Sequence, residues 1–176
     1  MRTRDHVLRA FLLAAALLTP AAARGQGAAS SRPRVVAYVP NWVDLKSFVD
    51  TIDYPKLTHI NVAFENPKTD AGDLSFSSKN DLLIAKARAN GVKVLVSIGG
   101  GAASGDKVLR KRYADLLADP AKRAGFVAKL AAYVGQHGFD GLDVDIEGPA
   151  ITAGYGELVA ELAAALKPAG GQPKLL

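Results

Sequence analysis

The chain contains no cysteine among its 176 residues. It therefore forms no disulfide bond, offers no thiolate to a metal and carries no cysteine-linked lipid. Basic residues number 22 against 17 acidic ones, and they form neither a block nor a basic stripe interleaved with aromatics, so a nucleic-acid-binding surface is not predicted. Apolar residues make up 49% and charged residues 22% of the chain, which is the composition of a folded globular domain.

A long apolar run occurs only near the N-terminus. Arg2, Arg4 and Arg9 precede AFLLAAALLT and then PAAA, and this order of charged, apolar and small residues predicts a secretory signal peptide over residues 1–23. A membrane anchor is disfavoured, because such a run spans only about half of the ~30 Å hydrocarbon core. Residues 24–34 are predicted to be a linker. We expect a secreted or periplasmic protein, with no membrane association after cleavage.

Short apolar segments alternate with helical patterns from residue 35 onward. Strands are predicted at 35–42, 59–64, 92–98 and 141–147, and helices at 47–56, 80–90, 107–118, 121–136 and 155–167, with a fifth strand opening in the final KLL. The apolar strands, including 35–42, are typical of strands buried on both faces. This alternation predicts an α/β fold with a parallel sheet, either doubly wound or a (β/α)₈ barrel.

The segment GFDGLDVDIEGP, residues 138–149, concentrates acidic residues in an apolar context. Because strand side chains alternate, Asp143, Asp145 and Glu147 share one face and the apolar residues between them share the other. Asp140 is out of phase, at the entrance of the strand. Three neighbouring carboxylates on a partly buried face cannot all ionise at low cost, so one is expected to hold a proton near neutral pH.

Glu147 is the predicted general acid. It lies at the C-terminal end of the strand, where parallel α/β folds place their working residues. Burial can raise the pKa of a glutamate to about 6–7, which suits proton transfer near neutral pH. We therefore expect Glu147 to be buried with a raised pKa.

Other interpretations of the acids and glycines remain. The acids could decorate an exposed strand, although parallel strands are normally covered on both faces. A calcium loop starting at Asp143 would have its glycine at Gly148 but needs a glutamate where Gly154 stands, so only magnesium bound by two carboxylates stays open. The glycines in SIGGG, residues 97–101, satisfy neither common nucleotide-binding pattern, so no nucleotide site is predicted.

Several motifs resemble those of one family. DGLDVDIE (140–147) is similar to the DxxDxDxE signature of glycoside hydrolase family 18, the chitinases and related endo-β-N-acetylglucosaminidases. VSIGG (96–100) resembles the SxGG motif on the third strand of that family. VVAYVPNW (35–42) and HINVAF (59–64) resemble its first two strands, in the same order.

The resemblance implies a (β/α)₈ barrel, of which this chain contains the first four βα units as a partial catalytic domain over residues 35–176. Such a barrel typically needs about 250 residues, so we expect the chain to be the N-terminal portion of a longer protein. The alternatives are two halves that pair as an oligomer and an inactive remnant.

The family mechanism implies a role for each acid. The reaction is retaining and substrate-assisted, because the substrate's own 2-acetamido oxygen replaces an enzyme nucleophile. Glu147 would protonate the glycosidic oxygen and later activate water, Asp145 would orient the acetamido group, and Asp143 would pair with Asp145. Tyr38 and Ser97 would support Asp143. Asp140 would be mainly structural.

Four further residues are predicted to bind substrate: Trp42, Phe64, Gly99 and Gly100. Trp42 and Phe64 could instead fill the core. The expected partner is a polysaccharide or glycan that contains N-acetylglucosamine, with no cofactor and no metal. A non-catalytic carbohydrate-binding barrel and a metal-dependent hydrolase are the alternatives, and the first usually lacks the acid that Glu147 supplies.

Overall fold

The structure is a computed structural model that describes residues 33–167 and 171–176. The predicted signal peptide, residues 1–23, and most of the predicted linker lie outside the described residues. Over the described ranges, every helix is too short or too polar to cross a membrane.

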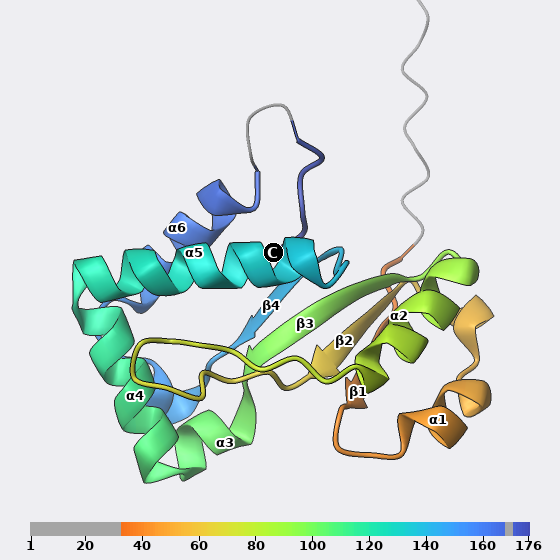
Figure 1. Ribbon diagram of the computed structural model, residues 1–176, viewed down its shortest axis with the longest axis horizontal. Coiled ribbons are helices and arrows are strands. Elements are labelled where there is room, and N and C mark those ends of the chain that lie inside the picture. The colour runs from red at the N-terminus through yellow and green to blue at the C-terminus, as the bar shows by residue number, and fades with distance from the viewer. Residues whose placement is uncertain (1–32, 168–170) are drawn as a thin grey trace, which may run out of the picture. The chain divides into compact units, whose positions relative to one another are not determined.

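Four parallel strands form one sheet in the order β1-β2-β3-β4 (Figure 1). Their bounds are β1 Val36–Pro40, β2 His59–Ala63, β3 Lys93–Gly99 and β4 Gly141–Asp145. The prediction of a parallel sheet with helical crossovers is confirmed. The strand order never reverses, as it would in a doubly wound sheet, so the arrangement is that of the first half of a (β/α)₈ barrel.

Six helices connect or follow these strands in the described part of the chain. They are α1 Leu45–Phe48, α2 Lys79–Ala89, α3 Gly100–Gly105, α4 Lys107–Ala118, α5 Pro120–Gln136 and α6 Tyr155–Ala165. Asp106 and Asp119 each accept two backbone hydrogen bonds at the starts of α4 and α5, which satisfies amide groups that have no partner inside the helix.

Two segments differ from the sequence-based prediction. The single helix expected at 47–56 is divided into α1 and two 3₁₀ turns, Val49–Thr51 and Tyr54–Lys56. The break has a local cause, because Pro55 lies in the second turn and disfavours a helical residue before it. The glycine-rich segment after β3, which was not predicted to be regular, forms the short helix α3.

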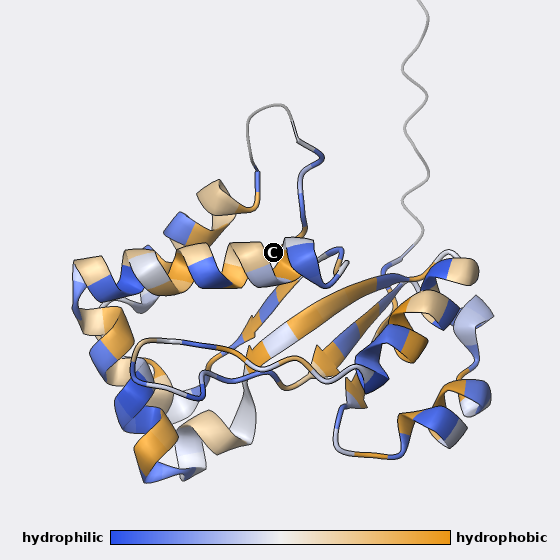
Figure 2. Ribbon diagram, viewed as in Figure 1, coloured by the Kyte–Doolittle hydropathy of each residue, from blue (hydrophilic) through white to orange (hydrophobic). Residues whose placement is uncertain are grey.

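The two faces of the sheet differ in chemistry. One face is apolar and lies under the helices, with α2 against β3 and α5 against β4; β3 is largely orange in Figure 2. The buried side chains of this face include Val39, Ile60, Val62, Val94, Val96, Ile98 and Leu142. The opposite face carries polar groups, among them Tyr38, Asn61, Ser97 and Asp143. Burial of the apolar face therefore holds the sheet in the register that presents the polar one.

The prediction that residues 35–42 are buried on both faces is wrong. Val35 is 44% and Val36 48% exposed, and Tyr38, on the same face of this edge strand as Val36, is 51% exposed. One face of β1 is therefore open among the described residues. At the other edge, Leu175 forms a parallel bridge with Gly141. The predicted start of a fifth strand is thus present as a single bridge.

Candidate active site

Strand β4 and the residues after it carry three of the four acids. Leu142 and Ile146 are buried on the helix side, with exposures of 0% and 4%, while Asp143 and Asp145 alternate with them. The backbone of Glu147 is still extended, at φ −134° and ψ 164°, so the alternation continues past the end of the strand. The Glu147 side chain is exposed. The expectation of a buried glutamate is therefore wrong in the described chain, because no described segment covers this position.

Asp143 is held by residues from two other strands. Tyr38 on β1 donates a hydrogen bond from Oη to Asp143 Oδ2 at 2.9 Å, and Ser97 on β3 donates from Oγ to the same oxygen at 2.8 Å. Ser97 is fully buried and lies directly opposite Asp143 in the β3–β4 register. Burial raises the pKa of Tyr38 most, and the nearby Asp143 adds to this while Asn61 opposes it. The phenol therefore stays protonated and able to donate.

Asp145 lies between the other two acids on the same side of the chain. Burial raises the pKa of its carboxyl, and the negative charges of Asp143 and Glu147 raise it further. A carboxyl surrounded in this way holds a proton to higher pH than an isolated aspartate. Such a group can donate a hydrogen bond when protonated and accept one when ionised.

The SxGG glycines allow close packing around the acids. A Cβ atom on Gly99 would lie 2.3 Å from the carbonyl oxygen of Asp145, and Gly99 has a φ of +104°, a conformation that favours glycine. A Cβ atom on Gly100 would lie 2.5 Å from the Phe64 ring. Both glycines therefore bring backbone and ring groups together next to the acids, and their contact with substrate stays a prediction.

The remaining predicted residues, Asp140, Phe64 and Trp42, differ in their burial and contacts. Asp140 accepts a hydrogen bond on Oδ2 from the backbone N–H of Val94 at 2.9 Å, so it ties the start of β4 to β3. Phe64 is half-buried. Trp42 is 71% exposed, which excludes the alternative that it fills the core.

Sequence reasoning missed two residues that shape the site. Asn66 exchanges two hydrogen bonds with the backbone of Gly99, at 2.7 and 2.9 Å, and accepts a third from Tyr113 Oη at 2.6 Å. Ser104 on α3 donates to the backbone carbonyl of Glu147 at 2.6 Å. The sequence could have indicated Asn66, because this residue lies shortly after a strand and directly before a proline. No sequence feature indicated Ser104.

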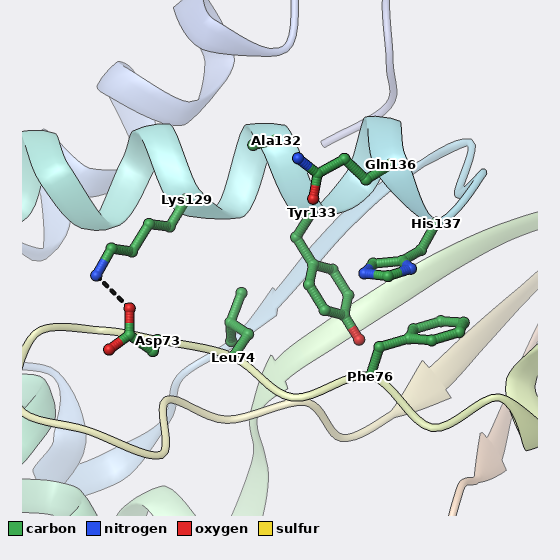
Figure 3. A pocket seen from close by; sticks show the side chains of 8 residues that line it. All are labelled: Asp73, Leu74, Phe76, Lys129, Ala132, Tyr133, Gln136 and His137. Atoms are coloured by element: carbon green, nitrogen blue, oxygen red, sulfur yellow. Dashed lines mark hydrogen bonds and ion pairs between the residues drawn. The ribbon is translucent and has the colours of Figure 1, made fainter.

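Two cavities lie outside the immediate surroundings of Glu147. One, of about 240 Å³, opens on the polar face of the sheet and is lined in part by His59, Asn61 and Asp143. The other, of about 310 Å³, lies between the segment before α2 and helix α5 (Figure 3). There Lys129 pairs with Asp73 and His137 stacks on Phe76, and no acid of β4 lines it. No group of three His, Asp or Glu side chains within the described ranges is placed to hold a metal ion.

Several known proteins are similar to this chain in sequence or in structure. A class V chitinase from Arabidopsis thaliana is 28% identical over 159 residues, which cover 83% of this chain and 41% of the relative. A crystal structure of a GH18 chitinase from Cycas revoluta in complex with (GlcNAc)3 is 28% identical, with a TM-score of 0.68 over 80% of this chain and 44% of that one. A chitinase-like agglutinin from Robinia pseudoacacia is 26% identical, with a TM-score of 0.66 and the same coverage.

The chain thus spans less than half the length of these relatives. The family model of glycosyl hydrolases family 18 matches residues 34–176. The match begins at the last residue of the predicted linker and runs to the end of the given sequence. The chain belongs to glycosyl hydrolases family 18.

Proposed function

We propose that the protein with this sequence is a secreted glycosidase that cleaves β-1,4 linkages between N-acetylglucosamine units of chitin or a related glycan. The observation that supports this activity most strongly is the arrangement of the acids. Asp143 is fixed by Tyr38 and Ser97, Asp145 has a raised pKa, and Glu147 is exposed at the C-terminal end of the strand. The (GlcNAc)3 bound to the Cycas revoluta chitinase supports the same class of sugar for this chain.

The first step of the proposed reaction breaks the glycosidic bond. Glu147 gives its proton to the glycosidic oxygen as that oxygen leaves the anomeric carbon. The carbonyl oxygen of the substrate's 2-acetamido group bonds to the anomeric carbon from the opposite side, which produces an oxazolinium ion without an enzyme nucleophile. In the second step, Glu147 takes a proton from water as the water oxygen attacks the anomeric carbon and the bond from that carbon to the acetamido oxygen breaks. Two inversions give net retention.

Asp145 and Asp143 serve the acetamido group in this proposal. An Asp145 carboxylate accepts a hydrogen bond from the acetamido N–H, which orients the carbonyl oxygen toward the anomeric carbon and stabilises the positive charge that develops. Asp143 cannot follow substrate movements freely, because two donors hold its Oδ2. It therefore provides a fixed negative charge beside Asp145.

A carbohydrate-binding protein without turnover is the second candidate. It is favoured by the likeness to the Robinia pseudoacacia agglutinin and by the exposed ring of Trp42, which could bind a sugar without any acid. The presence of Glu147 counts against it, since sugar binding alone does not need a general acid.

The substitution Glu147→Gln in the intact natural protein separates these candidates. We expect turnover of N-acetylglucosamine oligomers to fall by at least about 100-fold, because an amide cannot replace the general acid, while affinity for the oligomers is retained. Unchanged turnover would show that Glu147 is not the acid. Sugar binding with no turnover in the unsubstituted protein would favour the binding protein.

A further inference from the structure

Glu65 is a buried acid that the proposed mechanism does not use. It lies two residues after β2 and is only 4% exposed. Its backbone N–H donates to the carbonyl of Ser97 at 2.9 Å, which continues the pairing of β2 with β3. In the part of the chain that the structure describes, Glu65 forms no ion pair. A buried carboxyl without a cation is costly unless hydrogen bonds or protonation compensate for it.

Asn41 connects Glu65 to the end of β1. Its backbone N–H donates to the carbonyl of Ala63 at 2.7 Å. Its side-chain nitrogen donates to the carbonyl of Phe64 and to Glu65 Oε1, both at 3.0 Å. An amide nitrogen has two hydrogens, so these two bonds use both. The segment after β1 is thereby attached at three points to the end of β2 and the residues that follow it.

Asn80, near the start of α2, is the second partner of Glu65. It is fully buried, and its Nδ2 lies 3.4 Å from Glu65 Oε1 while its Oδ1 has no hydrogen-bond partner. Asn80 therefore adds a second neutral donor to the Glu65 oxygen that already accepts from Asn41.

The surroundings of Glu65 act on the pKa of its carboxyl in both directions. Burial raises the pKa of Glu65, and Lys68, Asn80 and Asn41 oppose this rise. Tyr133 on α5 also interacts with Glu65, because burial and then the charge of Glu65 raise the pKa of its phenol. Tyr133 therefore stays protonated beside Glu65.

We propose that Glu65 is a positioning residue that fixes Trp42 and Phe64 for contact with a sugar. Trp42 follows Asn41 directly and is exposed, so Asn41 is the attachment of its backbone to the sheet. Phe64 precedes Glu65, and its ring lies on Gly100. One carboxyl therefore holds the chain next to both predicted sugar-binding aromatics. The contact with sugar rests on the proposed function, whereas the fixing of Trp42 does not.

Trp42 is the only tryptophan, so its fluorescence tests the proposal without any assay of turnover. Glu65→Ala removes one of the two acceptors of the Asn41 side chain. Glu65→Gln keeps an acceptor oxygen in a side chain of the same shape, and Glu157→Ala replaces an exposed glutamate on α6 as a control. The measurements are Trp42 emission and anisotropy in the full chain, and titration with N-acetylglucosamine oligomers followed by the same signal.

We expect lower Trp42 anisotropy and about tenfold weaker sugar binding in Glu65→Ala, the loss that about 1.4 kcal/mol of binding energy would cause. Glu65→Gln should behave as the unsubstituted chain, and so should Glu157→Ala. Unchanged anisotropy in Glu65→Ala would overturn the proposal, and so would a Glu65→Gln variant as impaired as Glu65→Ala, since Glu65→Gln keeps an oxygen that can accept from Asn41.

The proposal stays testable if Glu65→Ala does not fold and if the unsubstituted chain binds no sugar. If Glu65→Ala does not fold, Asn41→Ala breaks the same link from the other side and should lower Trp42 anisotropy; an unchanged value there overturns the proposal. If the unsubstituted chain binds no sugar, the sugar-contact part fails together with the proposed function, and anisotropy still decides whether Glu65 positions Trp42.

Discussion

Ser97 lies opposite Asp143 across the β3–β4 pair and donates a hydrogen bond of 2.8 Å to its Oδ2. Tyr38 donates to the same oxygen from a strand 105 positions earlier in the sequence. Two neutral donors on one carboxylate oxygen hold Asp143 in a single orientation. Hydrogen bonds to charged groups are among the stronger ones in proteins.

Removing either donor should slow the proposed reaction. A hydrogen bond to a charged group contributes about 1.5–3 kcal/mol, so we expect Ser97→Ala and Tyr38→Phe each to lower kcat/KM by about 10–100-fold. The double variant should lose less than the product of the two effects, because both donors act on one oxygen. Tyr155→Phe is the control, since no hydrogen bond of its hydroxyl occurs among the described residues. Unchanged kinetics in both single variants would contradict the role of Asp143.

Asp140 should matter for stability more than for chemistry. Its bond to the Val94 amide joins β3 to the start of β4, so we expect Asp140→Ala to reduce the free energy of unfolding by about 1–3 kcal/mol. Asp140→Asn keeps an acceptor oxygen and should lose less. Urea unfolding followed by circular dichroism measures both. If Asp140→Asn abolished turnover at full stability, Asp140 would instead belong to the chemistry.

Gly99 is expected to tolerate no side chain. A Cβ atom 2.3 Å from the Asp145 carbonyl oxygen, at a φ of +104°, combines a clash with backbone strain, so Gly99→Ala should cost at least about 2 kcal/mol. Gly125→Ala in α5 is the matched control, because nothing lies within 4 Å of its added Cβ. A helix interior gains about 0.5–1 kcal/mol from this change. Equal unfolding midpoints for the two variants would disprove the packing argument.

Asp145 should make the stability of the fold depend on pH. Its folded pKa is raised above the ordinary value of 3.8, so its contribution to stability is fully present below that value and is lost as pH rises through the raised pKa. Asp145→Asn removes the titrating group. The free energy of unfolding of this variant should therefore decline less than that of the unsubstituted chain from about pH 3.5 to 7. Denaturant unfolding at several pH values measures this. A steeper decline in Asp145→Asn than in the unsubstituted chain would reverse the sign we expect.

A chelator distinguishes the substrate-assisted glycosidase from a metal-dependent hydrolase. The proposed reaction uses only carboxyl groups and the substrate's acetamido oxygen, so we expect turnover by the natural protein to be unchanged after dialysis against EDTA. Loss of activity that magnesium restores would favour the metal-dependent alternative. A buffer-dialysed sample serves as the control.

The sequence by itself determined the local features of this protein. The alternation of Asp143 and Asp145 with Leu142 and Ile146 defines one apolar and one acidic side of β4, because strand side chains repeat every two residues. The succession of apolar strands and helical segments likewise predicted the parallel sheet, since short-range periodicity is written directly in the chain.

Only the tertiary structure decided which distant groups meet and which are covered. The bonds from Tyr38 to Asp143 and from Asn41 to Glu65 depend on strand register, which no local pattern encodes. The exposure of Glu147 and Val36 and the burial of Glu65 depend on which segments pack over each position. Burial and long-range hydrogen bonds depend on how the strands and helices pack together, so only the tertiary structure could reveal them.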